Sequence, residues 1–498
     1  MSAVELHLPI LQVLVPLIAA LLSSFCRRGT TAWALALVAT WAAAAIAWWL
    51  VLKVTGTGQP ISYLLGGWKV PIGIEYRVDA LNAFVLALVT SVGAVLMPYA
   101  KKSVAHEIDS HNQAWFYTMY LLCLAGLLGI TVTGDAFNVF VFLEISSLAT
   151  YVLIAMGRHR RALLAAYQYL IVGTIGATFY VIGVGLLYLV TGSLNLYDIA
   201  ARLGTASPEL FRPLLVGLGF LTIGICLKLA LFPLHLWLPN AYAYAPSLAS
   251  AFLAGTATKV AVYLLIRIFF SVFGVAFSLN SLPVPEVLFV FSIAAMVIAS
   301  SSAAFEGNAK RLLAYSSVAQ IGYITLGIAL ANQSGLTGGI VHLMNHAAIK
   351  AALFMTLGAV LYRIGSVEIA DMAGIGRRMP LTMAAFVVAG LGIIGVPGTA
   401  GFISKWYLAV GALEKGYWPL VFLIVASSLI AVVYIGRVVE VAYFREPGPA
   451  AQGAHEPPVS MLVPIIVMTA LTIWLGIDTR FSADIAAQAA KLVLGGLK

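Results

Sequence analysis

Charged residues are scarce in this chain, and cysteine is almost absent. Asp, Glu, Lys and Arg make up 9% of its 498 residues, whereas 62% are hydrophobic. Soluble domains carry about 25% charged residues. The three cysteines, Cys26, Cys123 and Cys226, stand apart in apolar runs without a CxxC motif. This spacing excludes a disulfide framework or a Cys-based zinc site as the organising principle. With a mean hydropathy of +1.00, the composition predicts a polytopic membrane protein.

Motifs for nucleotide and hydrolytic chemistry are also missing. The sequence holds no Walker A, HExxH or GxSxG pattern. GLGIIG at 390–395 matches GxGxxG, but it lies in an apolar span with no strand before it, so it predicts close helix packing. We therefore expect neither an enzyme nor a cofactor. The net charge of +9 does not indicate a nucleic-acid partner, because the basic residues follow the membrane topology described below.

Apolar runs of bilayer-spanning length predict an all-α polytopic fold with about fourteen transmembrane helices. Two of these spans, 210–246 and 380–413, are interrupted, at Pro233 and at Pro397. A polar stretch at 53–79, rich in Gly and Pro, predicts an extended hairpin or loop. The sequence therefore predicts two broken helices within the bundle.

The two broken helices are the seventh and twelfth predicted spans, so their positions differ by an odd number. An odd offset reverses the direction of a helix in the membrane, and corresponding broken helices in two halves mark the site of inverted-repeat transporters. We therefore predict N-terminal helices and an external loop in 1–110, two inverted five-helix repeats in 112–274 and 286–444, and a last helix with a surface tail in 445–498. Each repeat is expected to be a proton half-channel.

Basic residues are distributed unevenly between the predicted loops. About twice as many of the 28 Lys and Arg residues fall in odd-numbered loops, Lys310 and Arg311 among them, as in even-numbered loops. The positive-inside rule then places the odd-numbered loops in the cytoplasm and both termini outside. We expect a multi-pass protein of a bacterial-type inner membrane, surrounded by the lipid bilayer.

Four lysines lie within predicted spans, but only one carboxylate, Glu144, lies near a span centre. The four are Lys228, Lys259, Lys350 and Lys405. Because one carboxylate cannot pair with four amines, some amines remain unpaired. Burial favours the neutral form of an unpaired amine, which can then accept and release a proton as an arginine cannot. The alternative is an ion pair for helix packing beside tolerated lysines, but ionisable groups this deep favour a functional role.

The depth of Lys259 follows from its distance to Pro246. Their separation of thirteen residues corresponds to about 20 Å along a continuous helix. This position is deep within a hydrocarbon core about 30 Å thick. Arg267 and Arg437 lie nearer the ends of their spans, where snorkelling to the interface is the expected explanation. Lys259 is therefore expected to face the bundle interior, a partner or a water-filled path.

Histidines accompany the lysines. His342, His346 and Lys350 repeat at i, i+4 and i+8 and share one helix face. Histidine suits a proton relay because it titrates near physiological pH, whereas buried histidines that bond to neighbours are the plainer alternative. No metal is expected, since HLMNH offers no glutamate base and no third ligand for zinc. His235 follows Pro233, and it either links the lysines or satisfies carbonyls freed by the break.

Sodium binding within this chain has little support from the sequence. A hard cation requires several oxygen ligands, and a single deep carboxylate provides few of them. Backbone carbonyls at the breaks could contribute. If sodium moves, we expect it to move largely outside this chain.

Several longer segments carry a resemblance to a known family. They are PLHLWLPNAYAYAPS with TKVAVYLLIR, TGDAFNVFVFLEISSLATY, KRLLAYSSVAQIGY, HLMNHAAIKAALF and GVPGTAGFISKW. Together they cover most of residues 60–445 and resemble the antiporter-like subunits shared by respiratory complex I and the multisubunit Mrp sodium/proton antiporters. The resemblance implies fourteen helices with two inverted five-helix repeats. Asn240-Ala-Tyr242 after LP, and TGDAFN around Asp135, are most similar to the Mrp D subunit.

The resemblance also implies roles for individual residues. Glu144 and Lys228 would be a coupled pair, Lys259 the central lysine and Lys405 the exit-side lysine, with two histidines linking them. The residues expected on the proton path are Glu144, Lys228, Lys259, His342, His346 and Lys405, supported by His235, Lys350 and Asp135.

The function implied by the resemblance is that of a proton-translocating subunit of a multisubunit Na⁺/H⁺ antiporter. Its partners would be the other membrane subunits, and the transported ions would be protons and Na⁺. One alternative is a proton-pumping subunit of an NADH–quinone oxidoreductase or a membrane-bound hydrogenase. A second alternative is a membrane scaffold whose ion pairs only fix helix packing.

Overall fold

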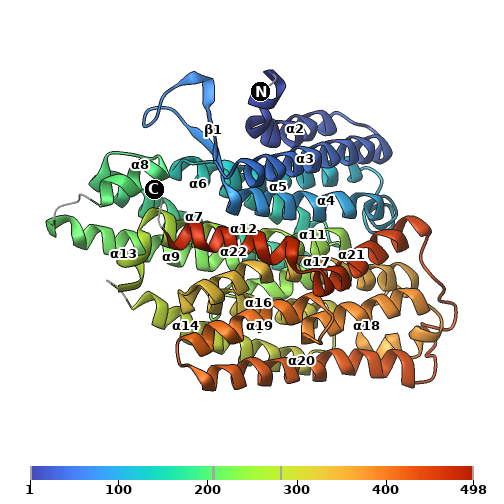
Figure 1. The fold of residues 1–498 in the computed structure, drawn as a ribbon. Coiled ribbons are helices and arrows are strands. Elements are labelled where there is room, and N and C mark those ends of the chain that lie inside the picture. Colours follow the sequence, from blue (N-terminus) through green and yellow to red (C-terminus); the bar gives the residue numbers. More distant parts are fainter. Residues whose placement is uncertain (1–2, 205–207, 281–282, 496–498) are drawn as a thin grey trace.

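The computed structural model describes residues 3–204, 208–280 and 283–495, and nearly all of this chain is helical. Most helices run side by side along one axis (Figure 1). Up to residue 204 the elements are α1 (Ala3–Leu6), α2 (Leu8–Ser24), α3 (Gly29–Thr57), β1 (Ile61–Leu64), η1 (Leu65–Gly67), β2 (Glu75–Val78), α4 (Ala80–Glu107), α5 (Gln113–Val132), α6 (Ala136–Ala155), α7 (Arg161–Thr191) and α8 (Leu196–Leu203).

The middle of the chain contains η2 (Pro208–Leu210), α9 (Phe211–Leu229), α10 (Trp237–Tyr244), α11 (Ser247–Gly255), α12 (Ala257–Ile266), η3 (Arg267–Val272), α13 (Gly274–Asn280), α14 (Val284–Ala294), η4 (Ala295–Ala299) and α15 (Ser300–Phe305). The remaining elements are α16 (Ala309–Leu330), α17 (Gln333–Ile364), η5 (Ile369–Met372), η6 (Ile375–Arg377), α18 (Pro380–Ile394), α19 (Ala400–Glu414), α20 (Trp418–Phe444), α21 (Val459–Ile477) and α22 (Arg480–Leu494). The segments η3 and η4 are π-helical.

Among the described residues, twelve helices are long and apolar enough to cross a membrane. A thirteenth span results if the bent pair Ile369–Arg377 and Pro380–Ile394 counts as one. The count does not reach the predicted fourteen, because α2 has only 17 residues and the helix around Pro397 is divided into α18 and α19, of 15 residues each. The polytopic architecture is confirmed, whereas the number fourteen is not.

A two-stranded hairpin interrupts the helices between α3 and α4. Strands β1 and β2 pair antiparallel, with Ile61 opposite Val78, so the polar stretch predicted as a hairpin or loop is a hairpin. It projects beside the bundle (Figure 1). We call this end of the bundle the hairpin end. The opposite end, with Lys101, Arg158 and Arg363, is the basic end. The fold is therefore nearly, but not entirely, α-helical.

Both predicted helix breaks are confirmed. Helix α9 ends at Leu229, and the chain turns through Ala230 at a φ of 59° before α10 begins. Helix α18 ends at Ile394, and the chain turns through Gly395 at a φ of 87° before α19 begins. A left-handed residue directly after a helix is a common way to end it, so each break combines such a turn with a proline two or three residues later.

A third break, at Thr256, was not predicted. Thr256 separates α11 from α12, and its amide bonds to the carbonyl of Leu253, three residues back. Its hydroxyl donates to the Phe252 carbonyl at 2.7 Å, a local bond that competes with the helix ladder. The expectation of one continuous helix from Pro246 to Lys259 was therefore wrong. Lys259 lies in the first turn of α12.

An isolated β-bridge that joins a helix cap to the segment after the following helix occurs at both ends of the bundle. Asp135, which caps α6, forms an isolated β-bridge with Asn195, just after α7. Asn308, which caps α16, forms one with Glu368, just after α17. The first bridge lies at the hairpin end and the second at the basic end. Two pairs of consecutive helices, α6 with α7 and α16 with α17, are therefore closed by the same kind of bridge and run in opposite directions.

The bundle has an early and a late half. Helices α2 to α6 lie on one side of it and α18 to α20 on the other (Figure 1). Between them α17 contacts α11, α16 and α19, so it joins the halves. The C-terminal helix α22 packs one face, with buried Ala486 and Ala490, along α17 and α4. The long central helix α17 is thus covered on most sides by other helices.

Candidate functional site

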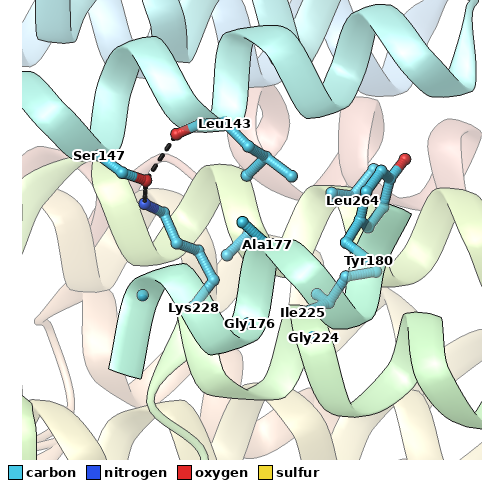
Figure 2. Close-up of a pocket in the computed structure, with 11 residues that line it drawn as sticks. Leu143, Ser147, Gly176, Ala177, Tyr180, Gly224, Ile225, Lys228 and Leu264 are labelled. Carbon is cyan, nitrogen blue, oxygen red and sulfur yellow. Dashed lines mark hydrogen bonds between the residues drawn. The ribbon is translucent and has the colours of Figure 1, made fainter. Parts of the chain in front are cut away.

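Lys228 is held between α9, α6 and α7. It lies in the last turn of α9, and its amine donates a hydrogen bond to Ser147 on α6, whose hydroxyl donates in turn to the Leu143 carbonyl at 2.5 Å (Figure 2). The amine also lies 5.4 Å from the centre of the Tyr169 ring on α7. A hydroxyl and an aromatic face attract an ammonium ion without neutralising it.

Glu144 is close to Lys228 but does not form an ion pair with it. The two interact electrostatically, whereas the direct contact of the amine is with Ser147. One carboxylate oxygen of Glu144 is buried without a hydrogen-bond partner in the described part of the chain. The side chain lies on the face of α6 that carries the exposed Val141 and Leu148. Glu144 therefore reaches the edge of this chain, where another subunit or lipid would meet it.

Glycines allow α7 and α9 to approach each other beside Lys228. Gly176 and Gly224 face one another across the two helices, and they line the pocket into which the stem of Lys228 extends (Figure 2). A β-carbon at Gly224 would lie 2.6 Å from the Gly176 carbonyl oxygen and 2.9 Å from the Tyr180 amide nitrogen. Both neighbours are backbone atoms, which cannot rotate aside. The contact therefore fixes how closely α9, the helix that carries Lys228, packs against α7.

Replacing Gly224 with alanine is expected to separate α7 from α9 and to displace Lys228. We expect a loss of about 1–3 kcal/mol, as overpacked sites typically show, measured as a lower unfolding temperature of the purified protein in detergent. Gly219→Ala on the same helix is the matched control, since no atom lies within 4 Å of its β-carbon position. Equal stability of the two variants would contradict this account of the contact.

Lys259 is buried, and its partners among the described residues are neutral. It is 1% exposed, and its amine donates to the Ala254 carbonyl at the end of α11 and contacts the Thr258 hydroxyl at 3.4 Å. The last carbonyls of a helix lack helical donors and carry a partial negative charge. The unpredicted break at Thr256 therefore supplies the acceptor that holds this lysine.

Lys405 uses the second predicted break in the same way. Its amine donates to the carbonyls of Ile393 and Ile394, the last two residues of α18, at 2.9 Å each. A third bond, of 2.8 Å, goes to the Ser428 hydroxyl, and the Tyr323 ring centre lies 4.7 Å away. Two of the buried lysines are thus placed at the carboxyl ends of broken helices.

Two histidines lie between these lysines on α17. The His342 ring contacts the Ser404 hydroxyl at 2.7 Å and the side-chain amide oxygen of Gln320 at 2.9 Å. The centre of the His346 ring lies 5.9 Å from that of His342. Both nitrogens of His346 are buried without a protein partner among the described residues. A neutral imidazole needs one donor and one acceptor partner, so His346 can bond to small polar molecules.

The lysines and histidines form one row across the middle of the bundle. Lys259 acts electrostatically on His346 and Lys350, and Lys405 acts on His342. Lys350 has its own neutral acceptor, the Leu313 carbonyl at 2.8 Å. In the described part of the chain, no ion pair involves any of these lysines or Lys228. The lysines of the row are thus held by neutral oxygens.

His235 and Asp135 occupy other positions. The buried ring of His235 lies 5.2 Å from the Phe232 ring and 6.4 Å from the Tyr315 ring, and among the described residues no contact joins it to Lys228 or Lys259. Asp135 caps α6 by accepting the Asn138 amide at 2.7 Å. Burial raises the pKa of the Asp135 carboxyl, and amide bonds from the first turn of α6 offset part of this rise. Asp135 thus has a structural role at the hairpin end.

The expectation that Arg267 snorkels to the interface was wrong. Its side chain is 2% exposed, and its guanidinium pairs with both oxygens of Asp79, at 2.8 and 2.9 Å. Asp79 caps α4 directly after the hairpin, so α4 and η3 are tied together. No sequence pattern indicated this pair, because its partners lie 188 residues apart.

The described residues contain no group of three or more His, Cys, Asp and Glu side chains that could hold a metal ion. The side-chain partners of Lys228 and of the row that the sequence interpretation missed are Ser147, Gln320, Ser404 and Ser428. The position of Ser404, next to Lys405, is the only one of these that adjacency would have indicated.

A family model described as NADH:quinone oxidoreductase/Mrp antiporter, TM, matches residues 133–431, more than half of the chain. The chain belongs to this family. NADH-quinone oxidoreductase subunit N from Desulforudis audaxviator is 43% identical to this antiporter-like subunit over 492 residues, which are 95% of this chain and 96% of the relative. The D subunit of a Na⁺/H⁺ antiporter from Bacillus subtilis is 27% identical over 487 residues, with 97% of each chain covered.

A solved structure has the same fold as this antiporter-like subunit. A chain in the Mrp complex from Dietzia sp. DQ12-45-1b superposes with a TM-score of 0.89 at 25% identity, covering 99% of this chain and 98% of that chain. The antiporter-like subunit is thus a multi-pass membrane protein whose family includes subunits of both antiporters and quinone oxidoreductases.

Proposed function

We propose that this antiporter-like subunit moves protons along its buried lysines and histidines, as a D-type subunit of a multisubunit Na⁺/H⁺ antiporter. The observation that carries the proposal is the row from Lys259 through His346 and His342 to Lys405, in which every amine is held by neutral oxygens. An amine without a carboxylate partner gains little from staying charged in a low-dielectric interior. It can therefore change between ammonium and neutral forms.

In this proposal, the distance between Glu144 and Lys228 controls the protonation of Lys259, the first lysine of the row. When the carboxylate approaches Lys228 it stabilises the ammonium form and weakens the positive field on Lys259, which favours protonation of Lys259. When the two separate, the positive field rises, and the proton moves from Lys259 towards His346, His342 and Lys405. The bond of Lys228 to Ser147 supports such a two-position device, because the amine already has an acceptor other than Glu144.

Proton transfer between these side chains would take place through water. His346 offers two buried nitrogens that no described protein group satisfies. Buried polar atoms of this kind are usually satisfied by ordered water. We infer that water contacts His346 and connects it to Lys259 and Lys350.

The two half-channels follow the predicted repeats, 112–274 and 286–444. The matching β-bridges at opposite ends of the bundle support this division, since each joins the cap of the second helix of a unit to the residue after the third. In this proposal the basic end faces the cytoplasm, and both termini lie outside. The half-buried Glu144 at the bundle edge supports contact with another membrane subunit of the complex.

A second function, proton pumping within a redox-driven quinone oxidoreductase, is favoured by the 43% identity to a subunit N. The proton path would be the same, but electron transfer elsewhere in the complex would supply the energy. The scaffold alternative requires the row to be dispensable for transport.

The two candidate functions differ in what drives proton movement. In everted vesicles that hold the intact complex, we expect addition of Na⁺ to discharge an imposed proton gradient, followed with a pH-sensitive dye. Vesicles without the complex provide the background. Proton uptake that requires an electron donor and ignores Na⁺ would contradict the antiporter assignment and support the redox-driven one. Identification of the co-purified chains provides an independent answer.

A further inference from the structure

A charged cavity of about 440 Å³ opens at the basic end, outside the row described above. It lies where α4 and α17 end, where α16 begins and where α10 passes into α11, so both halves of the bundle border it. Its acidic, basic and histidine side chains are His106, Glu107, Arg158, His159, Arg161, Lys310 and Glu368, and the Tyr244 phenol also lines it. These side chains come from five separate segments of the chain, so the cavity is a product of the tertiary fold.

Lys310 is the buried member of this group. The sequence places it in a loop, but it lies in the first turn of α16, is 2% exposed and donates to the Ala245 carbonyl at 3.3 Å. The first turn of a helix is the positive end of its dipole and disfavours a cation. Its neighbour Arg311 is more accessible, with a side chain that is one-third exposed and pairs with Glu306. Helix stability therefore does not explain the burial of Lys310.

Glu107 is fixed beside Lys310. One of its carboxylate oxygens accepts the Ser103 hydroxyl at 3.0 Å, and the other accepts the Ser247 amide at 3.0 Å. Glu107 acts electrostatically on Lys310 without a direct ion pair. Ser247 is the first residue of α11, so this carboxylate is anchored to the helix that leads to the break before Lys259.

Lys310 also connects the cavity with the row. Leu313, one turn further along α16, offers the carbonyl that holds Lys350 at 2.8 Å. Lys350 in turn acts electrostatically with Lys259. Lys310, on the cavity wall, and the carbonyl that holds Lys350 therefore lie one turn apart on α16.

We propose that the cavity is the proton inlet at the basic end and that Lys310 is the relay group between cavity water and Lys350. The proposal rests on the proposed function. The neutral amine of Lys310 takes a proton from hydronium in the cavity, which leaves water. The resulting ammonium gives the proton through water to the neutral amine of Lys350, so only O–H and N–H bonds form and break. Glu107 is a positioning residue that stabilises the ammonium form of Lys310.

The test compares Lys310→Met and Lys310→Arg with Arg311→Gln in the intact complex in everted vesicles. We expect both Lys310 variants to lower the rate of proton-coupled transport by at least about tenfold, since a positioned proton-transfer group contributes about 10²–10⁴-fold. Arginine is expected to fail because it does not release its proton. The adjacent Arg311→Gln variant is expected to stay within about twofold of the unmodified protein, because surface ion pairs contribute little. Glu107→Gln is expected to shift the pH of half-maximal rate downwards, since the ammonium form of Lys310 loses its support.

A labelling experiment leaves Lys310 intact and so remains informative if its variants do not assemble. Leu361→Cys, on the cavity wall, is placed in a protein whose Cys26, Cys123 and Cys226 are replaced by alanine. A cationic, membrane-impermeant thiol reagent added at the basic end is expected to slow transport in this variant only.

Unchanged transport after complete labelling would overturn the proposal. Normal transport by Lys310→Met, together with an inactive Lys259→Ala variant, would also overturn the proposal. This result would leave the proposed function unaffected. Normal transport by both of these variants would instead remove the proposed function itself.

Discussion

Replacement of Lys259 by alanine is expected to reduce proton-coupled transport to the background of vesicles without the complex. Lys259 is the amine through which every proton must pass in the proposed path, and among the described residues no carboxylate or second amine occupies its place beside the Ala254 carbonyl. Loss of a positioned proton carrier typically costs about 10²–10⁴-fold, which is beyond the sensitivity of a vesicle assay. Lys228→Ala and Glu144→Ala are expected to have the same outcome, because they remove the pair that controls the row.

The change of Lys259 to arginine separates charge from proton transfer. Arginine keeps the positive charge and can bond to the same carbonyl, but it stays protonated at all accessible pH values. We therefore expect Lys259→Arg to assemble and yet to transport no protons. The measurement is dye-reported proton movement, with the amount of assembled complex determined on the same membranes. Normal rates in the alanine variants of Lys259, Lys228 and Glu144 would discard the scheme and favour the scaffold alternative.

Replacement of Asp79 by asparagine is expected to destabilise the protein strongly. Asparagine still caps α4 well, so the variant removes the negative charge and leaves the cap in place. Arg267 is then a buried cation without its partner. Breaking a buried pair in this way costs about 3–5 kcal/mol, which we expect to see as a large decrease in the unfolding temperature of the protein in detergent.

A double variant identifies the origin of this loss. Asp79→Asn combined with Arg267→Met removes both charges, and we expect it to recover most of the stability, since buried pairs often tolerate apolar replacement. The exposed pair Asp478 and Arg480 is the matched control, and Asp478→Asn is expected to change little. If the double variant were as unstable as the single one, the unpaired charge would not be the cause.

The sequence predicted the two helix breaks that lie next to prolines. Proline lacks an amide hydrogen and crowds the preceding turn, so Pro233 and Pro397 indicated where α9 and α18 end. The break at Thr256 depends instead on a side-chain bond within α11, a competition that threonine sometimes wins and often loses. It was therefore not predictable, although it determines how Lys259 is held.

The sequence predicted the burial of some ionisable residues but not the partners of their side chains. Hydropathy indicated that Lys259 and Lys405 lie deep in the membrane, because their apolar neighbours are adjacent in sequence. Hydropathy could not indicate their partners, since carbonyls of Ala254 and Ile393 become acceptors only where a helix stops. It also misplaced Arg267 and Lys310, whose burial depends on elements distant in the chain. Long-range pairing is a property of the tertiary fold, and one sequence alone does not contain it.

The two β-bridges at opposite ends of the bundle bear on how such a chain can originate. In the proposed division each unit has five crossings, so it starts on one side of the membrane and finishes on the other. A tandem duplication of its gene therefore inserts the second copy upside down without any further mutation.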